Sequence, residues 1–490
     1  MHPHSVTPGI TPWCRKLNTE SQSSSGRRGR EGKASLGTPL RLSFFGTRFK
    51  FCSPQTGEYR GEILVEFTVR RNKVMVTKPL RLLIVCGHPV QYMSPILRDL
   101  SRQTDVKLQV AYCCLHGADA SHDPEFNTIV KWDIPLLDGY EWVEIPNRGS
   151  GSEGFWGLCN LGLWKFIRRG NFDAVICHTG YIRASFWISY LAARRSHSAF
   201  LFGTDASSLA PRDSKRWKVI LKKLLWPHLF GLADQTMVCS TAGVQLMHSL
   251  GLPENRITMT PFVVDNDWWN AQKAQANRAE VRKSWGVGLN DRVVLFCAKL
   301  QPWKRPLDLL QAFAAAAVPE TFLVFAGEGP LREHLEAEAE KLGIASRVRF
   351  LGFTNQTQLP RVYSAADLFV LPSDYDPCPV VVCEAMLCGL PVLLSDEIRG
   401  RFDLVRSGST GDIFPCADVQ ALAGALRRLL NDQSTLKKLG VNARVRMETW
   451  APRDNILATV EAVNRAIQNR GADTARHSVR QIPQSPQANR

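Results

Sequence analysis

Hydrophobic residues occur along most of this chain as short runs separated by longer amphipathic stretches. Short apolar runs bounded by turn-forming residues are typical of buried strands, and the stretches between them have the spacing of helices. In the first half of the chain the runs are Leu82–Gly87, Val106–Cys113, Ala174–Cys177, Ala199–Gly203, Gln235–Cys239 and Arg256–Pro261. Such alternation of strands and helices predicts a doubly wound parallel sheet.

The segment Leu371–Ser395 is the most informative part of the second half. Apolar residues at its two ends predict strands, with a Pro-rich loop and a short helix between them. Asp376 then lies in the loop and Glu384 in the helix. Free N–H groups at the start of this helix, near Val380 and Val381, can bind a phosphate. The two carboxylates can accept hydrogen bonds from sugar hydroxyls, so one segment can hold a nucleotide sugar.

Two lysines in an earlier segment have the charge that a diphosphate requires. Val293–Pro306 begins as an apolar strand and continues into a loop with Lys299 and Lys304. Lysines on loops are usually solvated, but a position directly after a strand favours a binding role. The charge of a diphosphate leaving group grows as the bond to the sugar breaks, and two ammonium groups can stabilise it as Mg²⁺ does elsewhere. We therefore predict no metal ion.

These motifs resemble those of the retaining glycosyltransferases of family 4, also called glycosyl transferases group 1. The family signature has two glutamates separated by seven residues, and here Asp376 stands in place of the first glutamate in DPCPVVVCEAM. Gly327 and Gly329 match the family's strand-Gly-x-Gly-Pro segment. The resemblance covers residues 80 to 466 and implies two Rossmann-like domains facing a cleft, the arrangement called GT-B.

The resemblance also implies roles for individual residues. Glu384 would bind ribose, Lys299 and Lys304 the diphosphate, and Asp376 the donor sugar. The predicted donor-binding residues are Lys299, Lys304, Gly327, Gly329, Asp376, Val380, Val381 and Glu384. The predicted catalytic residues are His178, Asp376 and Lys304. Pro379, in the place of the family's glycine, has no N–H, so one backbone donor is missing and the donor sugar stays open.

Polar residues also follow the strands of the first half. Ligands of such sheets bind beyond the carboxyl ends of the strands, where this chain has His88, His178 and Asp205. His178 can orient the acceptor hydroxyl, or it can be a hydrogen-bonded histidine at the end of a strand. Two Asp-x-Asp sequences begin at Asp265 and Asp374, a pattern that binds Mn²⁺ in the other large glycosyltransferase fold. With the lysines in place for the diphosphate, the prediction of no metal stands.

The predicted domain organisation has five parts. They are residues 1–77, a basic and largely disordered extension; 78–262, the acceptor-side domain; 263–449, the nucleotide-sugar-binding domain; 450–470, a helix that packs back on the first domain; and 471–490, a disordered tail. Residues 1–78 hold 14 Lys or Arg and 5 Asp or Glu, so they supply +9 of the net charge of +16. The extension can be a targeting arm, but the interpretation that we favour is a translation start at Met75.

The remaining composition bears on the cellular location. Thirteen cysteines without paired spacing favour a reduced cytoplasm, and no apolar run approaches the length of a membrane span. Residues 211–230 predict a basic helix with Trp217 and Trp226. Such a helix can lie on the anionic inner face of a membrane and meet a lipid-linked acceptor. The alternative that we favour is a helix packed on its sheet with its lysines in water.

The sequence therefore predicts a glycosyltransferase that moves a hexose-type sugar from a nucleotide-diphosphate sugar to an acceptor hydroxyl. As the resemblance implies, the anomeric configuration is retained and the acceptor is a surface polysaccharide, a glycolipid or a similar glycoconjugate. No cofactor other than the donor is expected. One alternative is a sugar-nucleotide epimerase or phosphorylase of the same two-domain plan. A nucleic-acid-binding protein is the other alternative, and the concentration of positive charge in the extension argues against it.

Overall fold

The structure is a computed structural model that describes residues 48–52, 59–64, 78–123, 125–210 and 216–480. Contacts within the chain divide it into two units, Met1–Met75 and Val76–Arg490. In the first unit, strand β1 (Arg48–Cys52) pairs antiparallel with β2 (Tyr59–Leu64). Both strands lie within the extension that was predicted to be largely disordered. Apolar and polar residues alternate in RFKFC, which is a strand pattern, within a segment of basic composition. The other residues of the predicted extension lie outside the described part.

The second unit contains two parallel sheets, and the first has seven strands in the order β11-β10-β9-β8-β3-β4-β7. The strands are β3 (Leu80–Cys86), β4 (Val106–Tyr112), β7 (Trp142–Glu144), β8 (Ala174–Cys177), β9 (Ala199–Thr204), β10 (Gln235–Val238) and β11 (Ile257–Met259). The strands predicted from apolar runs are all present. The sequence did not reveal β7 because its side chains are exposed or half-buried.

The second sheet has six parallel strands in the order β14-β13-β12-β15-β16-β17. They are β12 (Arg292–Cys297), β13 (Thr321–Ala326), β14 (Val348–Phe350), β15 (Leu368–Leu371), β16 (Val392–Ser395) and β17 (Gly411–Phe414). Every residue of β15 and β16 is buried, which explains why these strands are continuous apolar runs. The prediction of two doubly wound parallel sheets is confirmed.

Each sheet has a switch point at which the strand order reverses, and ligands of doubly wound sheets bind there. The reversal lies between β3 and β8 in the first sheet and between β12 and β15 in the second. The chain reaches His88 soon after β3 and His178 directly after β8. In the second sheet it reaches Lys299 after β12 and Asp376 after β15. These four predicted site residues therefore lie next to the reversals.

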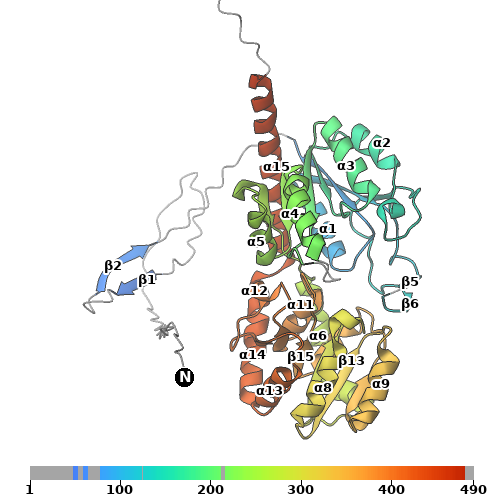
Figure 1. The fold of residues 1–490 in the computed structure, drawn as a ribbon, viewed down its shortest axis with the longest axis vertical. Helices are drawn as coiled ribbons and strands as arrows, with labels where there is room; N and C mark the ends of the chain where they lie inside the picture. Colours follow the sequence, from blue (N-terminus) through green and yellow to red (C-terminus); the bar gives the residue numbers. More distant parts are fainter. Residues whose placement is uncertain (1–47, 53–58, 65–77, 124, 211–215, 481–490) are drawn as a thin grey trace, which may run out of the picture. The chain divides into compact units, whose positions relative to one another are not determined.

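Helices cover the two sheets (Figure 1). Those of the first lobe, residues 78–262, are α1 (Met93–Ser101), α2 (Gly162–Gly170), α3 (Ala184–Arg195), α4 (Arg216–Gly231) and α5 (Thr241–Ser249). Those of the second lobe, residues 263–449, are α6 (Asn266–Ala274), α7 (Arg278–Ser284), α8 (Pro306–Ala316), α9 (Arg332–Lys341), α10 (Leu359–Ala365), α11 (Val380–Leu387), α12 (Arg401–Leu404), α13 (Val419–Leu430) and α14 (Gln433–Arg446). Among the residues that the structure describes, no helix is both long and apolar enough to cross a bilayer.

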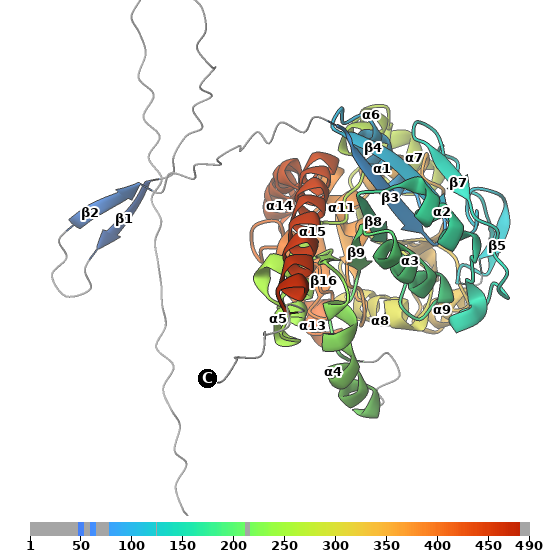
Figure 2. The ribbon, with the colours of Figure 1, turned by 90° about the horizontal axis from the view of Figure 1, so that it is seen from above.

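The last helix, α15 (Pro452–Arg480), follows the second lobe in sequence but lies along the first (Figures 1 and 2). It contacts α1, β9, β10 and β11. The Asn455 side-chain amide donates a hydrogen bond to the Pro261 carbonyl oxygen at 2.7 Å, which fixes the start of the helix at the junction of the lobes. The predicted helix ended at residue 470, whereas α15 continues to Arg480. Residues 481–490 lie outside the described part.

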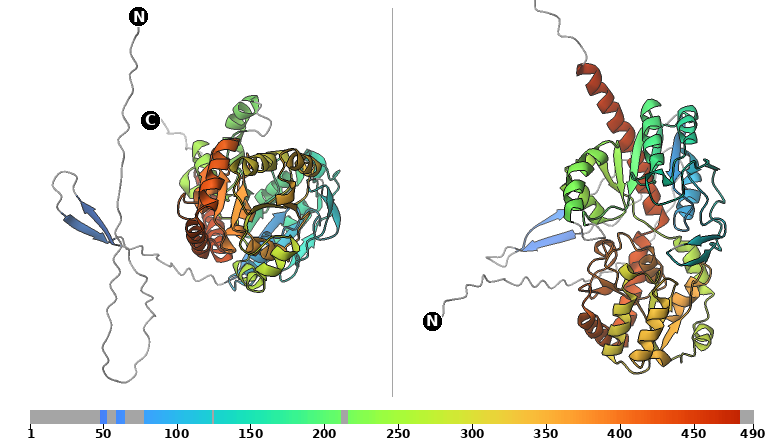
Figure 3. Two further views of the ribbon diagram at one scale, coloured as in Figure 1. Left: turned by 90° about the horizontal axis from the view of Figure 1, so that it is seen from below. Right: turned by 45° about the vertical axis from the view of Figure 1, so that its right-hand side comes forward.

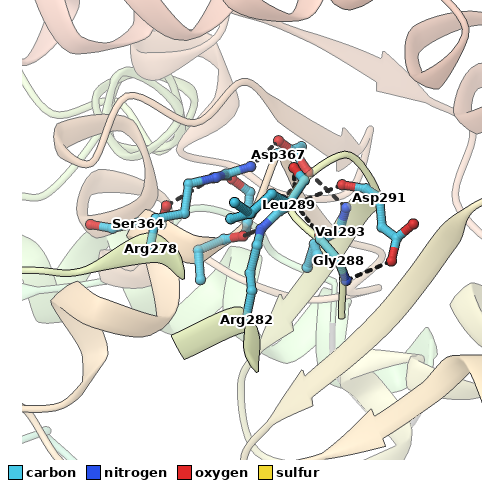
Figure 4. Close-up of polar contacts among 10 residues, drawn as sticks. Arg278, Arg282, Gly288, Leu289, Asp291, Val293, Ser364 and Asp367 are labelled. Atoms are coloured by element: carbon cyan, nitrogen blue, oxygen red, sulfur yellow. Dashed lines mark hydrogen bonds and ion pairs between the residues drawn. The ribbon is translucent and has the colours of Figure 1, made fainter. Parts of the chain in front are cut away.

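A buried arginine joins three elements of the second lobe (Figure 4). The Arg282 side chain on α7 is fully buried. It donates to the Asp367 carboxylate at 2.6 Å, to the Ala365 carbonyl oxygen at 2.9 Å and to the Asp291 carbonyl oxygen at 2.7 Å. The same carboxylate accepts a hydrogen bond from the Val293 N–H at 2.8 Å. This network fixes α7 against the beginnings of β12 and β15, whose far ends carry the candidate site.

Candidate active site

A cavity of about 440 Å³ lies at the carboxyl ends of β12, β13 and β15. We call it the donor cavity. Of the predicted donor-binding residues, it is lined by Lys299, Lys304, Gly327, Asp376, Val380, Val381 and Glu384. Gly329 is not among its lining residues. A Cβ atom at Gly329 would lie 2.7 Å from the Leu300 carbonyl oxygen, so this glycine lets two loops approach each other.

Gly327, at the wall of the donor cavity, also allows two segments of backbone to approach each other. Its φ of +148° is one that side chains rarely adopt, and a Cβ atom there would lie 2.1 Å from the Ala298 carbonyl oxygen. The Gly327 N–H also donates to the Gly352 carbonyl oxygen at 2.9 Å. The glycine therefore keeps the end of β13 against the end of β12, where any side chain would collide with the backbone.

Lys304 and Asp376 form an ion pair inside the donor cavity. The Lys304 ammonium lies 2.5 Å from a carboxylate oxygen of Asp376, and the aspartate is only 7% exposed. In this structure each group satisfies the other. A bound diphosphate can take over the ammonium group and leave the carboxylate free to accept hydrogen bonds from sugar hydroxyls. The two predicted roles are thus geometrically compatible in one place.

Lys299 is paired with residues of the first lobe, which the sequence did not indicate. Its ammonium lies 2.5 Å from the Glu125 carboxylate and 3.5 Å from that of Asp123. It also lies 4.6 Å from the centre of the Phe126 ring. These partners belong to or adjoin β5 (Ser121–Asp123) and β6 (Thr128–Val130), an antiparallel pair in the first lobe. Lys299 therefore joins the two lobes at the mouth of the donor cavity.

Glu384 is a buried carboxyl group in the middle of α11. It is 3% exposed and accepts a hydrogen bond from the Tyr363 hydroxyl at 2.9 Å. Burial raises the pKa of Glu384 from 4.5 to about 7, although hydrogen bonds from Tyr363 and Gln356 act in the opposite direction. With a pKa of about 7, Glu384 changes its charge in the physiological pH range. Ligands that need its carboxylate form will therefore bind better above about pH 7.

This raised pKa predicts a dependence of stability on pH. Between about pH 4.5 and about pH 7 the folded protein keeps the Glu384 proton, whereas the unfolded chain releases it. The free energy of unfolding therefore falls as pH rises through this window, by up to about 3 kcal/mol from this group. Glu384→Gln, which cannot ionise, is expected to lack this part of the decline. Chemical denaturation of both proteins at about pH 5 and about pH 8 measures this decline. An equal decrease in the free energy of unfolding for the wild type and for Glu384→Gln would contradict the prediction.

A second cavity, of about 530 Å³, lies beyond the carboxyl ends of β3, β8 and β9 in the first lobe. We call it the acceptor-side cavity. His178 and Asp205 both line it, and burial lowers the pKa of His178 to about 4. Its imidazole is therefore neutral at physiological pH and can accept a hydrogen bond. A Cβ atom at Gly203 would lie 2.3 Å from His178 Nδ1, so the glycine makes room for the ring.

The two cavities meet at a shared wall, and His178 lies on the side away from Asp376 and Lys304. The residues that line both cavities are His88, Val90, Tyr92 and Tyr375. Burial and the neighbouring His116 lower the pKa of His88. The sequence pointed to His88, because it follows a strand, but gave no sign of Tyr375, which stands between the two acids of Asp374-Tyr-Asp376.

The two Asp-x-Asp sequences have other partners in the structure. Asp265 caps α6 by accepting a hydrogen bond from the Trp268 N–H at 3.0 Å. Asp374 lies 3.8 Å from the Arg305 guanidinium, and Asp376 is paired with Lys304. Within the described ranges, no group of three or more His, Cys, Asp or Glu side chains could hold a metal ion.

The second lobe matches a known protein family. Residues 277–446 match the sequence model described as glycosyl transferases group 1. This range runs from α7 to α14 and contains all of the predicted donor-binding residues.

Similarity to two characterised sequences extends further. The D-inositol 3-phosphate glycosyltransferase of Corynebacterium glutamicum is 31% identical over 359 residues, which cover 69% of this chain and 82% of that protein. The alpha-D-kanosaminyltransferase of Streptomyces kanamyceticus is 29% identical over 210 residues, 42% of this chain and 53% of that protein. The chain thus matches most of the length of the former and about half of the latter.

The fold also matches solved structures. The HepE protein of Anabaena, crystallised with UDP and glucose, has a TM-score of 0.61 and 19% identity to this chain. The match covers 79% of this chain and 99% of that protein. At this level of identity the similarity shows the fold, two Rossmann-like domains in the GT-B arrangement, as predicted.

Proposed function

Because this chain belongs to the glycosyl transferases group 1 and has the GT-B fold, we propose that it transfers a sugar from a nucleotide-diphosphate sugar to an acceptor hydroxyl. The observation that carries this proposal is the donor cavity, where two ammonium groups, a helix start and two carboxylates converge. The second cavity adjoins it across the wall formed by His88, Val90, Tyr92 and Tyr375. Two adjoining cavities can hold a donor and an acceptor in reach of each other.

The proposed donor contacts follow from the positions of the charged groups. Lys299 and Lys304 would bind the diphosphate together with the N–H groups at the start of α11, Val380 and Val381. Glu384, further along the same helix, would accept the ribose hydroxyls. As the bond to the sugar breaks, the ammonium groups stabilise the negative charge that collects on the leaving diphosphate. No cofactor besides the donor enters this scheme.

Two finer points belong to the same proposal. We propose that the anomeric configuration is retained, which the likeness to family 4 supports. We also propose that no metal ion takes part, because Lys299 and Lys304 already provide positive charge at the diphosphate. Proton NMR of the freshly formed product distinguishes retention from inversion. Turnover that survives a chelator supports the second point, and loss of turnover that Mn²⁺ or Mg²⁺ restores would refute it.

The acceptor-side cavity supports a glycoconjugate as acceptor. Tyr181, Ile182 and Trp226 give it an aromatic and apolar wall, while His178 and Asp205 provide polar groups. Such a lining fits the face of a sugar ring and the apolar part of a lipid carrier. We propose that His178, in its neutral form, orients the acceptor hydroxyl. We propose as acceptor a surface polysaccharide intermediate or a glycolipid at the cytoplasmic face of a membrane. Such a molecule combines a sugar ring with an apolar carrier.

A panel of nucleotide sugars tests the proposed function. At least one member is expected to raise the melting temperature of the purified protein, because a ligand at about 100 times its Kd stabilises a protein by about 2.7 kcal/mol. Glu384→Gln is expected to reduce this stabilisation, and Glu448→Gln, in a different part of the second lobe, is the matched control. No stabilisation by any nucleotide sugar would refute the proposal. Conversion of the donor sugar without an acceptor would favour an epimerase.

A further inference from the structure

Helix α4 presents an unusual face to solvent. Its exposed apolar residues are Trp217, Ile220, Leu221, Leu224 and Leu225, with exposed fractions between 44% and 64%. Their spacing places all five on one side of the helix. Contiguous exposed apolar surface of this kind marks an interaction site rather than ordinary protein surface. The sequence-based preference for a helix packed on its sheet therefore does not hold for the first turns of α4.

The other end of α4 is firmly attached to the first lobe. Trp226, Leu229 and Phe230 are buried, and the Phe230 ring stacks on Phe202 with 5.3 Å between the ring centres. The Trp226 indole N–H donates to the Tyr181 hydroxyl at 3.0 Å. The preceding turns project away from the rest of the lobe (Figures 2 and 3). The helix is thus a fixed projection with its apolar face uncovered.

Positive charges border this apolar face. The sequence of α4, RWKVILKKLLWPHLFG, contains no acidic residue. With 100° between successive residues, Arg216 and Lys223 lie along one edge of the apolar face and Lys218 along the other. Lys222 lies further round and lines the acceptor-side cavity, where it donates to the Leu209 carbonyl oxygen at 3.2 Å. An apolar face bordered by cations is the pattern of a helix that lies in the surface of an anionic bilayer.

Two further apolar side chains of the first lobe are exposed. Ile182, which is 52% exposed, lines the acceptor-side cavity beside the Tyr181 that contacts α4. The next residue, Arg183, donates to the Gly154 carbonyl oxygen at 3.0 Å. This bond holds the turn that carries Trp156, which is 66% exposed. Of these two exposed side chains, Ile182 lines the same cavity as Lys222 and Trp226 of α4.

We propose that this surface, formed by the five apolar residues of α4 together with Ile182 at the acceptor-side cavity, docks on an anionic lipid bilayer. The acceptor-side cavity then opens at the membrane, and its acceptor is a sugar or hydroxyl attached to a lipid tail. This inference rests on the proposed function for the identity of the cavity. A second copy of the chain is a poorer occupant because its α4 would bring the same positive charges to the contact.

Flotation with vesicles tests the surface. The full-length protein is expected to float with vesicles of phosphatidylcholine containing about one quarter phosphatidylglycerol, and about tenfold less with pure phosphatidylcholine. The double variant Ile220→Ser/Leu224→Ser should float with the anionic vesicles at least about tenfold less than the wild type. Val441→Ser/Val445→Ser is the matched control, since these valines of α14 are similarly exposed in the second lobe, and it should float like the wild type.

Each outcome decides between the alternatives. If the wild type does not float while a nucleotide sugar still stabilises it, the membrane surface is refuted and the proposed function stands. If it floats but no nucleotide sugar stabilises it, the proposed function fails and the surface stands. A dimer in light scattering that Ile220→Ser/Leu224→Ser abolishes, without flotation, would identify a second copy as the occupant and refute the proposal. Salt that releases the protein from the anionic vesicles would support the role of the cations.

Discussion

Lys304→Gln is expected to lower turnover about 10² to 10³-fold, the effect of removing one group that stabilises developing negative charge in a transition state. The Lys304 ammonium is partly buried in the donor cavity, where its interaction with a diphosphate is weakly screened. Glutamine can still donate a hydrogen bond to Asp376, so the carboxylate is not left without a partner. Release of nucleoside diphosphate from the donor found in the stabilisation panel measures the turnover.

Lys341→Gln is the matched control for this experiment. Lys341, on α9, is 74% exposed in its side chain and pairs with Glu338, so its replacement should leave turnover within about twofold. Melting temperatures of the two variants separate lost chemistry from lost folding. A well-folded Lys304→Gln variant with turnover within tenfold of the wild type would remove Lys304 from the transition state, and with it the central part of the proposed mechanism.

Arg282→Met is expected to lower the free energy of unfolding by about 3 to 5 kcal/mol, because it leaves buried polar groups without their partner. The substitution removes the hydrogen bonds to the Asp367 carboxylate and to the Ala365 and Asp291 carbonyl oxygens. Methionine fills a similar volume, so the lost stability comes from the missing hydrogen bonds and not from an empty cavity. Urea denaturation followed by fluorescence measures the change.

Arg102→Met provides the comparison for this loss. Arg102 pairs with Asp99 on the surface, and its side chain is 68% exposed, so the substitution should cost less than about 1 kcal/mol. The decrease in the free energy of unfolding for Arg278→Met should lie between those for Arg102→Met and Arg282→Met. Arg278 also binds Asp367, but its side chain is 38% exposed. A cost for Arg282→Met as small as that for Arg102→Met would show that the network contributes little to stability.

The sequence predicted most of the fold because the strands are buried on both faces. Runs such as AVIC in β8 and LFVL in β15 are apolar at every position, which distinguishes them from the surrounding helices. The strands that were missed lack this property. β7 is exposed or half-buried along its length, and β17 begins with Gly411-Asp412. Edge strands that are not buried at every position leave a weaker hydrophobic signal in a sequence.

The candidate site was predictable where its residues follow strands within one lobe. Lys304 and Asp376 come from neighbouring loops of one sheet, and the structure places them 2.5 Å apart. The pair of Lys299 with Glu125 was not predictable, because 174 residues separate them and they come from different lobes. Tyr375 was missed for a similar reason. Its importance comes from the meeting of two cavities, which no local pattern records.

The return of α15 to the first lobe has a mechanical consequence. The chain passes between the lobes twice, once after Phe262 and once near Trp450, and the Trp450 indole N–H donates to the Phe262 carbonyl oxygen at 2.9 Å. The two passages are thus fastened side by side. The Lys299–Glu125 pair joins the lobes at a second place, so an opening of the cleft about these passages would separate that pair.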